Sequence, residues 1–196
     1  MDLPERLGRF LRERKRTALS EPDAVECAVL VPIVREPSGH AVVYTLRSEE
    51  LPSHKGQVSF PGGKRAPGDR TLLDTALREA GEEIGIDPAD VTILGQLDDV
   101  FTMVTDYIIT PFVGLLPDGV RFTPNPSEVS DLFTVSIEDL LDPRYHEIAT
   151  KNFRGHEIDI EVITAGRHTI WGATHRITAN LIECLRELRA GAMDRS

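Results

Sequence analysis

Several features that define other protein classes are scarce or missing in this chain of 196 residues. It has two cysteines, Cys27 and Cys184, which are too few for a disulfide framework. Both lie in apolar patterns, so we expect buried, reduced thiols. No apolar run is long enough to span a bilayer, and the first residues do not form a signal peptide. We therefore expect a cytoplasmic protein without a membrane partner.

Basic residues are also in short supply. The chain has 22 Lys and Arg against 32 Asp and Glu, a formal net charge of −10, which argues against general nucleic-acid binding. An acidic protein can still bind a phosphorylated small molecule where a metal ion and a few cations screen the phosphates. The length and a hydrophobic content of 40% predict a single domain over residues 1–196. A monomer and a homodimer both remain open.

The most informative stretch, residues 60–86, combines a Gly-Pro loop with an amphipathic helix. The helix is predicted to end at Gly85, where glycine commonly caps a helix. Glu79 and Glu83 lie one turn apart on its polar side, with Glu82 about 60° away. The residues predicted to share the apolar face are Leu73, Ala76, Leu77, Ala80 and Ile84.

This polar side is unfavourable for a helix on its own. Carboxylates one turn apart repel, and Glu82 and Glu83 lie in the last turn, where the helix dipole disfavours negative charge. Each conflict costs from a few tenths to about 1 kcal/mol at a solvated surface. Arg78 can offset part of this by pairing with Glu82. A solvated acidic face is the alternative, but the adjacent glycine-rich loop favours a divalent-cation site, where oxygen ligands turn the repulsion into binding.

The same residues resemble the Nudix box, G-x5-E-x7-R-E-U-x-E-E-x-G-U. The matching positions are Gly63, Asp69, Arg78, Glu79, Ala80, Glu82, Glu83, Gly85 and Ile86. Asp69 stands where the motif has Glu, and one extra residue separates it from Arg78. The segment REAGEEIGI matches at every specified position.

A second signature lies directly upstream, in VYTLRSEELPSHKGQVSFPGG. It resembles the segment that accompanies the Nudix box in coenzyme A pyrophosphatases, L-L-T-x-R-[SA]-x3-R-x3-G-x3-F-P-G-G. The positions in register are Thr45, Arg47, Ser48, Gly56, Phe60, Pro61, Gly62 and Gly63. Pro52 replaces the second arginine and cannot donate to a phosphate. Arg12, Lys55 and Lys64 are candidates to compensate.

The resemblance implies a Nudix α/β/α sandwich with a mixed sheet and a Mg²⁺- or Mn²⁺-dependent hydrolase. The substrate would be the diphosphate of coenzyme A or its thioesters, and the products 3′,5′-ADP and a 4′-phosphopantetheine species. Glu79, Glu83 and Glu82 would hold the metal, with Arg78 in the catalytic group. The residues expected to contact substrate are Arg47, Lys55, Gly62, Gly63 and Lys64. A guanidinium such as that of Arg47 can bind phosphate through two hydrogen bonds.

The general base is less well defined. Glu82 is one candidate, and the loops after the box supply Asp98, Asp99, Glu128 and Asp131. Glu128 is favoured because Nudix proteins often place an acid in that loop. Two other functions stay open. One is a Nudix hydrolase of another nucleoside diphosphate derivative, such as ADP-ribose or NADH, and the other is a nucleotide sensor without turnover.

The rest of the chain alternates predicted strands and helices, which favours a mixed sheet between helices. Pro111 argues for an edge or a bulge in its strand. A further hairpin is expected to turn at Arg154-Gly155. The other predicted elements are helices at about 4–16 and 169–189 and strands at 24–35, 41–47, 91–100 and 104–117.

Overall fold

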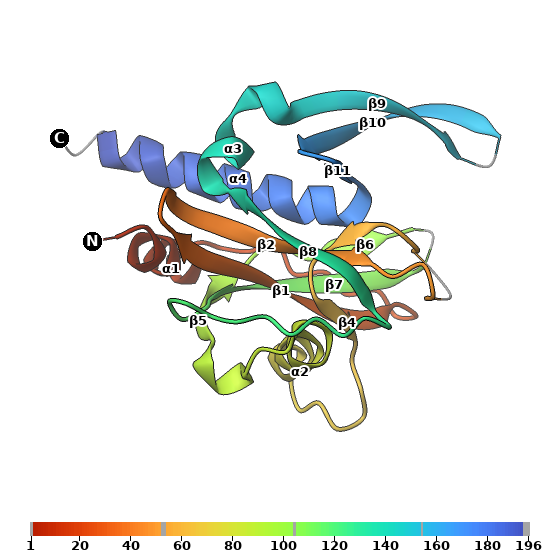
Figure 1. Cartoon of the computed structure of the whole chain (residues 1–196), viewed down its shortest axis with the longest axis horizontal. Coiled ribbons are helices and arrows are strands. Elements are labelled where there is room, and N and C mark those ends of the chain that lie inside the picture. The colour runs from red at the N-terminus through yellow and green to blue at the C-terminus, as the bar shows by residue number, and fades with distance from the viewer. Residues whose placement is uncertain (1, 52–53, 104, 154, 194–196) are drawn as a thin grey trace.

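The computed structural model describes residues 2–51, 54–103, 105–153 and 155–193 (Figure 1). Its centre is a mixed sheet with the strand order β3-β2-β1-β7-β5, in which β4 also pairs with β1, β6 with β7, and β8 with β2. The strands are β1 (Val25–Glu36), β2 (Gly39–Arg47), β3 (Val58–Ser59), β4 (Gly62–Lys64), β5 (Thr92–Gln96), β6 (Val100–Thr102), β7 (Tyr107–Leu115) and β8 (Val129–Ser136).

Strand β1 forms the spine of this sheet. It runs parallel to β7 along its first nine residues, and on its other side it pairs antiparallel with β4 and then with β2. Its apolar run is buried on both faces, as expected of a strand in the middle of a sheet. Ala28 and Leu30 pack in one core cluster, whereas Val31 and Ile33 pack in the other.

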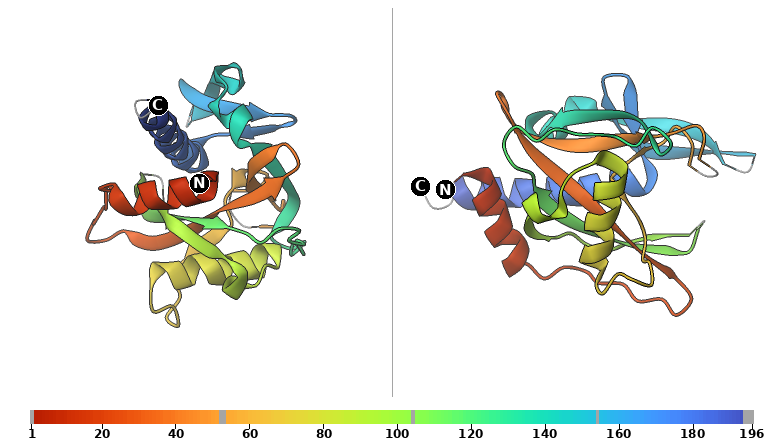
Figure 2. Two further views of the ribbon diagram at one scale, coloured as in Figure 1. Left: turned by 90° about the vertical axis from the view of Figure 1, so that its left-hand side faces the viewer. Right: turned by 60° about the horizontal axis from the view of Figure 1, so that its bottom comes forward.

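Helices cover both faces of the sheet. Helix α2 (Leu72–Ile84) buries Ala76 and Ala80 against one face. Helices α1 (Leu3–Glu13) and α4 (Gly172–Met193) lie on the other, opposite to α2 (Figure 2). The expected α/β/α sandwich with a mixed sheet is thus confirmed. Among the described residues, no helix is both long and apolar enough to cross a membrane.

A second, three-stranded sheet with the order β11-β10-β9 extends from this body. Strands β9 (His146–Phe153) and β10 (His156–Ala165) form a long hairpin, and β11 (His168–Ile170) pairs with the end of β10. The expected hairpin is confirmed, although Arg154, at its predicted turn, lies outside the described residues. Between the two sheets the chain forms the short helix α3 (Ile137–Leu141) and a 3-10 turn at Pro143–Tyr145. Another 3-10 turn, at Pro88–Asp90, follows α2.

The terminal helices have other boundaries than the sequence predicts, and the last one ends at Met193 instead of residue 189. Helix α1 ends at Glu13 instead of residue 16. Arg14 is extended, and the side chains of Arg14 and Arg16 pair with Asp98 and Asp99. At the other end, residues expected to start the last helix form β11, because they pair with β10, and α4 begins only at Gly172.

Pro111 does not lie in an edge strand. Strand β7 is inside the sheet, and Pro111 is in register with Val29 of β1. On the opposite side, its carbonyl accepts from the Leu97 N–H at 3.0 Å, between β5 and β6. The nitrogen of Pro111, which carries no hydrogen, points to the same side as its carbonyl, toward the gap between β5 and β6. The missing N–H therefore costs the sheet no inter-strand hydrogen bond. The sequence predicts one strand at residues 91–100, whereas the structure has two short strands there, β5 and β6.

Candidate active site

The stretch from Pro61 to Arg65 is held as part of the sheet. Gly62 and Gly63 pair with Val29 and Ala28 of β1, and the Leu30 N–H donates to the Pro61 carbonyl at 2.9 Å. A Cβ on Gly62 would lie 2.4 Å from the carbonyl oxygen of Ala28, so only glycine allows this approach. The glycines of the predicted site thus bring the chain between β1 and α2.

Gly63 makes room for the first glutamate of the helix. A Cβ at this position would lie 2.4 Å from Oε1 of Glu79. Glu79 is half-buried, and the loss of solvent raises its pKa, an effect that Arg78 opposes and Glu82 and Glu128 increase. The carboxylate of Glu79 is therefore packed against the glycine backbone instead of extending into solvent.

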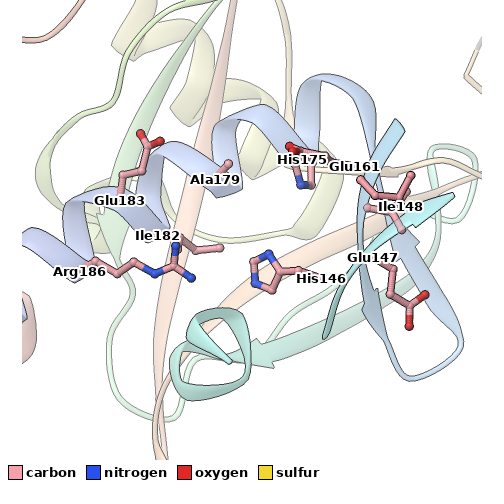
Figure 3. Close-up of a pocket in the computed structure, with 10 residues that line it drawn as sticks. His146, Glu147, Ile148, Glu161, His175, Ala179, Ile182, Glu183 and Arg186 are labelled. Carbon is pink, nitrogen blue, oxygen red and sulfur yellow. The ribbon is translucent and has the colours of Figure 1, made fainter. Parts of the chain in front are cut away.

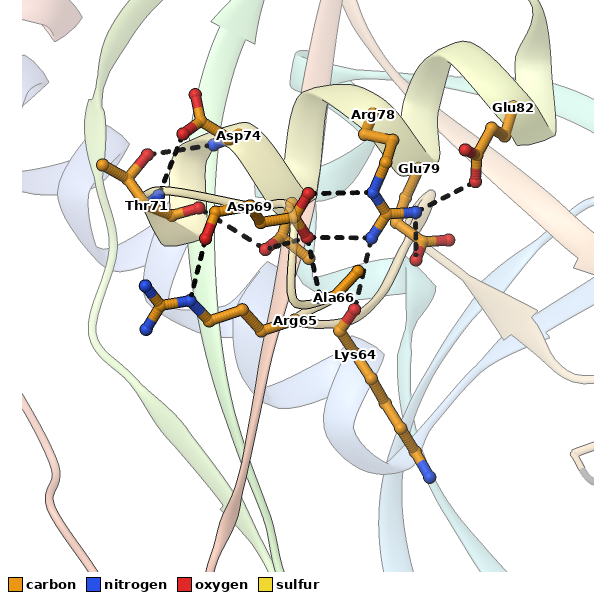
Figure 4. A network of polar contacts seen from close by, with 10 residues as sticks. Lys64, Arg65, Ala66, Asp69, Thr71, Asp74, Arg78, Glu79 and Glu82 are labelled. Atoms are coloured by element: carbon orange, nitrogen blue, oxygen red, sulfur yellow. Dashed lines mark hydrogen bonds and ion pairs between the residues drawn. The ribbon is translucent and has the colours of Figure 1, made fainter.

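Arg78 fixes this carboxylate through a network that Figure 4 shows. Its guanidinium binds both oxygens of Asp69 at 3.0 Å, Oε1 of Glu79 at 2.9 Å and Oε2 of Glu82 at 3.0 Å. A further bond reaches the carbonyl oxygen of Lys64. The pairing of Arg78 with Glu82 is confirmed. Arg78 thus joins the loop before the helix to two of the three glutamates.

Asp69 completes this network although it departs from the motif. Arg78, the Ala66 N–H and the Thr75 hydroxyl all donate to its carboxylate, which holds its pKa well below its usual range. Thr75 and Ala66 were not expected to take part. The shorter side chain reaches Arg78 because the loop from Ala66 folds back toward the helix, with the Asp69 N–H donating to the Ala66 carbonyl.

Glu83 is the most buried of the three glutamates. Its side chain is 4% exposed, against 17% for Glu79 and 55% for Glu82. Burial raises the pKa of Glu83 to about 8; Arg47 opposes this shift and the carboxylate of Glu79 adds to it. Nη1 of Arg47 is 3.9 Å from Oε1 of Glu83. Within the described residues, Oε2 of Glu83 and Nε of Arg47 are buried without a hydrogen-bond partner.

Glu128 approaches the same point from a separate loop. That loop closes the end of α2, where the N–H groups of Thr123 and Asn125 donate to the carbonyls of Ile84 and Glu83, both at 2.9 Å. The Glu128 carbonyl accepts from the Ser48 N–H at 2.8 Å, beside Arg47. The side-chain amide of Asn125 donates to Oε1 of Glu128 at 3.0 Å.

Asn125 was not anticipated as a neighbour of the site. Its own side chain accepts from the N–H and hydroxyl of Ser127, forming an Asx turn within the sequence NPSE. That turn chemistry is readable from sequence and would have indicated that Glu128 is held in place.

The other acids considered as the general base are engaged elsewhere. Asp98 pairs with Arg14 and Asn180, and Asp99 binds Arg16 and the Thr110 hydroxyl. Asp131 lies between Arg167 and His168. Arg167 holds its pKa below the ordinary value. Glu128 and Glu82 thus remain as the acids nearest to the buried pair of Glu79 and Glu83.

The two predicted lysines are both exposed. Lys64 is exposed, and its ammonium is 5.0 Å from the centre of the Tyr107 ring. Figure 4 shows its side chain directed away from the carboxylates. Lys55 is exposed on the loop after β2. Pro52, which replaces the signature arginine, lies outside the described residues. Of the expected substrate contacts, Arg47, Gly62 and Gly63 lie beside the carboxylates of Glu79 and Glu83.

The carboxylates of Glu79 and Glu83 suit a hard divalent cation. Both have raised pKa values, and one oxygen of Glu83 is buried without a partner, so a cation would satisfy it. Glu82 is turned to Arg78. Among the residues described, no group of three or more Asp, Glu, His or Cys side chains is already arranged around an ion position.

Comparison with known proteins agrees with this arrangement. The sequence profile of the NUDIX domain matches residues 26–154, about two thirds of the chain. The chain belongs to the NUDIX family. The match covers β1, the glycine turn, helix α2 and the loop of Glu128, so that every residue of the cluster lies inside the domain.

Bacterial relatives cover more of the chain. The protein named Uncharacterized Nudix hydrolase NudL from Photorhabdus laumondii is 38% identical over 156 residues, which are 80% of this chain and 82% of the relative. The protein of the same name from Yersinia pestis (strain Pestoides F) is 34% identical over 192 residues, covering 90% of this chain and 95% of the relative. The similarity therefore extends beyond the NUDIX domain.

Solved structures share the fold at low sequence identity. A MutT/nudix family protein from Enterococcus faecalis aligns with a TM-score of 0.56 and 12% identity, covering 97% of this chain and 70% of that one. The Nudix hydrolase RenU from M. smegmatis aligns with a TM-score of 0.55 and 17% identity, covering 85% and 86%. These likenesses support the fold alone.

Proposed function

We propose that this NUDIX protein hydrolyses the diphosphate of coenzyme A or its thioesters, giving 3′,5′-ADP and 4′-phosphopantetheine or its acyl form. The observation that carries this proposal is the position of Arg47. This residue of the upstream signature lies 3.9 Å from the buried Glu83 of the helix. The segment typical of coenzyme A pyrophosphatases and the glutamate helix therefore meet at one place.

Each residue of the cluster has a role in this reaction. Glu79 and Glu83 would hold a Mg²⁺ or Mn²⁺ ion, with Glu82 available on the same turn. The ion would supply positive charge that stabilises the charge developing on the phosphates. Arg78 keeps Glu79 in place, and Arg47 donates to a phosphate oxygen.

Glu128 takes the proton of the attacking water in this proposal. The water oxygen bonds to one phosphorus, and the bridging oxygen leaves with the other phosphate. The amide of Asn125 orients the base by donating to its Oε1. The absence of a side chain at Gly63 leaves the space that the carboxylate of Glu79 takes at this site.

A substrate panel tests the proposal. Wild type and Glu83→Gln would be incubated with CoA, dephospho-CoA, ADP-ribose and NADH, with Mg²⁺, with Mn²⁺ or with EDTA, and the phosphate-ester products followed. CoA should exceed dephospho-CoA by roughly ten- to a hundredfold in kcat/KM, because the 3′-phosphate adds charge for a basic side chain to pair. Hydrolysis should require the metal and be lost in Glu83→Gln.

Other outcomes would replace the proposal. ADP-ribose or NADH cleaved at least as efficiently as CoA would overturn the CoA specificity. Micromolar nucleotide binding without product after long incubation would point to a sensor. Arg47→Ala should lower kcat/KM for CoA, whereas Arg35→Ala, which removes a surface arginine paired with Asp2 and Asp118, should not.

A further inference from the structure

The outer edge of the long hairpin has the features of a strand edge that can pair with a further strand. In Figure 1, β9 lies on the outside of the hairpin, and β10 separates it from β11. Within the described part of the chain, β9 pairs with β10 alone. Its sequence, HEIATKNF, contains no proline, and Ile148 is 66% exposed. Edge strands of this kind accept another strand unless they are protected.

Two features lie against the hairpin in the described part of the chain. Between β9, β10 and α4 lies an open cavity of about 290 Å³, whose lining includes Glu147 and Ile148 of β9 and His175 of α4 (Figure 3). Further along β9, the ammonium of Lys151 lies 3.5 Å from the centre of the Trp171 ring. Both contacts are made by side chains, and in the described part of the chain no strand pairs with the outer backbone edge of β9.

The register of the hairpin identifies which backbone groups point outward. Phe153 pairs with His156 across a two-residue connection, and Gly155 has a φ of 85°. Such a turn closes on a hydrogen-bonded pair. Because the hydrogen-bonded pairs alternate along an antiparallel ladder, the N–H and C=O groups of Asn152, Thr150 and Ile148 face away from β10.

We propose that β9 pairs antiparallel with β9 of a second copy of this chain, with the two-fold axis at Ala149. This register places Ile148 opposite Thr150 of the partner subunit, and both are outward-facing positions. It also places Glu147 opposite Lys151 of the partner subunit, and the symmetry repeats this pair. Shifting the register by two residues in either direction removes this pairing of opposite charges, so the charges select one alignment.

The resulting dimer joins two three-stranded sheets into one sheet of six. An interface made by one edge strand is small, which places its affinity at the weak end of specific complexes. The proposal is independent of the substrate, because it involves none of the residues of the candidate active site. It assigns the hairpin a role in assembly.

Sedimentation velocity of the full chain tests this pairing over about 5 to 500 µM, a range suited to weak interfaces. Wild type should change from monomer to dimer within it. Glu147→Lys or Lys151→Glu would each place like charges opposite one another twice and should weaken dimerisation about tenfold or more. The double reversal restores opposite charges and should recover dimerisation. Glu157→Lys makes the same charge change on an exposed residue of β10 and should leave dimerisation unchanged.

A backbone variant checks the ladder itself. Thr150→Pro removes an outward N–H and should prevent dimerisation, with circular dichroism reporting whether the chain remains folded. A wild-type chain that stays monomeric at every concentration overturns the proposal. A dimer that persists in folded Thr150→Pro and in both single charge reversals would show an interface elsewhere, and a double reversal weaker than either single would exclude this register.

Discussion

The carboxylate of Glu79 lies where a side chain at position 63 would begin, with Oε1 only 2.4 Å from the Cβ that Gly63 lacks. Gly63→Ala therefore forces Glu79 away from its position. Because the clashing atoms are at the end of a flexible side chain, the fold can adjust, and the cost should fall on activity. We expect kcat to drop about tenfold or more while the melting temperature changes by only a few degrees.

Gly68→Ala is the matched control for this substitution. A Cβ at Gly68 would meet nothing within 4 Å, and the residue lies in the loop between β4 and α2. It should keep wild-type kcat. Equal losses in Gly63→Ala and Gly68→Ala would mean that loop flexibility, and not the contact with Glu79, determines the rate.

Glu83→Gln should stabilise the metal-free protein in a pH-dependent way. The pKa of Glu83 is raised to about 8 in the folded chain, against an ordinary value of 4.5. Between these values the unfolded chain loses the proton and the folded chain keeps it, so wild-type stability falls as the pH rises. Relative to wild type, the variant should gain stability from about pH 5 to pH 9, on the order of 4 kcal/mol in total.

Urea unfolding in EDTA at several pH values measures this difference. Glu82→Gln provides the comparison, because the side chain of Glu82 is 55% exposed and pairs with Arg78. It should show no comparable gain. A constant difference between wild type and Glu83→Gln across this pH range would contradict the buried, proton-binding carboxylate.

Glu128→Gln tests the proposed base. The amide keeps the size of the side chain but cannot accept the proton of water, so kcat should fall at least about a hundredfold with little change in KM. Asp98→Asn should instead lower stability and leave kcat near wild type, because Asp98 is held by Arg14 and Asn180. Steady-state kinetics and thermal unfolding of both variants separate these roles. A near-normal kcat in Glu128→Gln would transfer the role to Glu82.

Arg78→Lys probes how the helix is fixed to its loop. An ammonium cannot reproduce the paired bonds to Asp69 while also reaching Glu79 and Glu82. We expect kcat to fall about tenfold or more through misplacement of Glu79, with KM less affected. Arg70→Lys, on an arginine whose side chain is 90% exposed, is the control and should behave as wild type in the same assay. Unchanged kcat in Arg78→Lys would assign the network to stability alone.

Local patterns in the sequence predicted the helix and its cap well. Gly85 has the left-handed conformation expected of a capping residue, with a φ of 70°, and Arg78 pairs with Glu82 one turn away. Both features depend on residues within one or two turns. The α/β/α architecture followed from the order of apolar segments and from the family resemblance.

Features that depend on distant residues were not predictable. Glu82 and Glu83 are adjacent in sequence, yet only Glu83 is buried, because the ends of β2 and of the loop holding Glu128 close over it. The roles of Asp98 and Asp99 are decided by Arg14 and Arg16, more than eighty residues away. Short strands such as β11 form through their partners, and no periodicity indicates three residues of strand.

The pairing of β4 with β1 has a consequence for motion. The turn that faces the carboxylates is bonded to the spine of the sheet, from the Arg65 N–H and Glu26 carbonyl at one end to the Pro61 carbonyl and Leu30 N–H at the other. Separating it from β1 requires opening the centre of the domain. Its amide protons should therefore exchange with solvent as slowly as those of the core strands, so that the glycine turn is rigid before any substrate arrives.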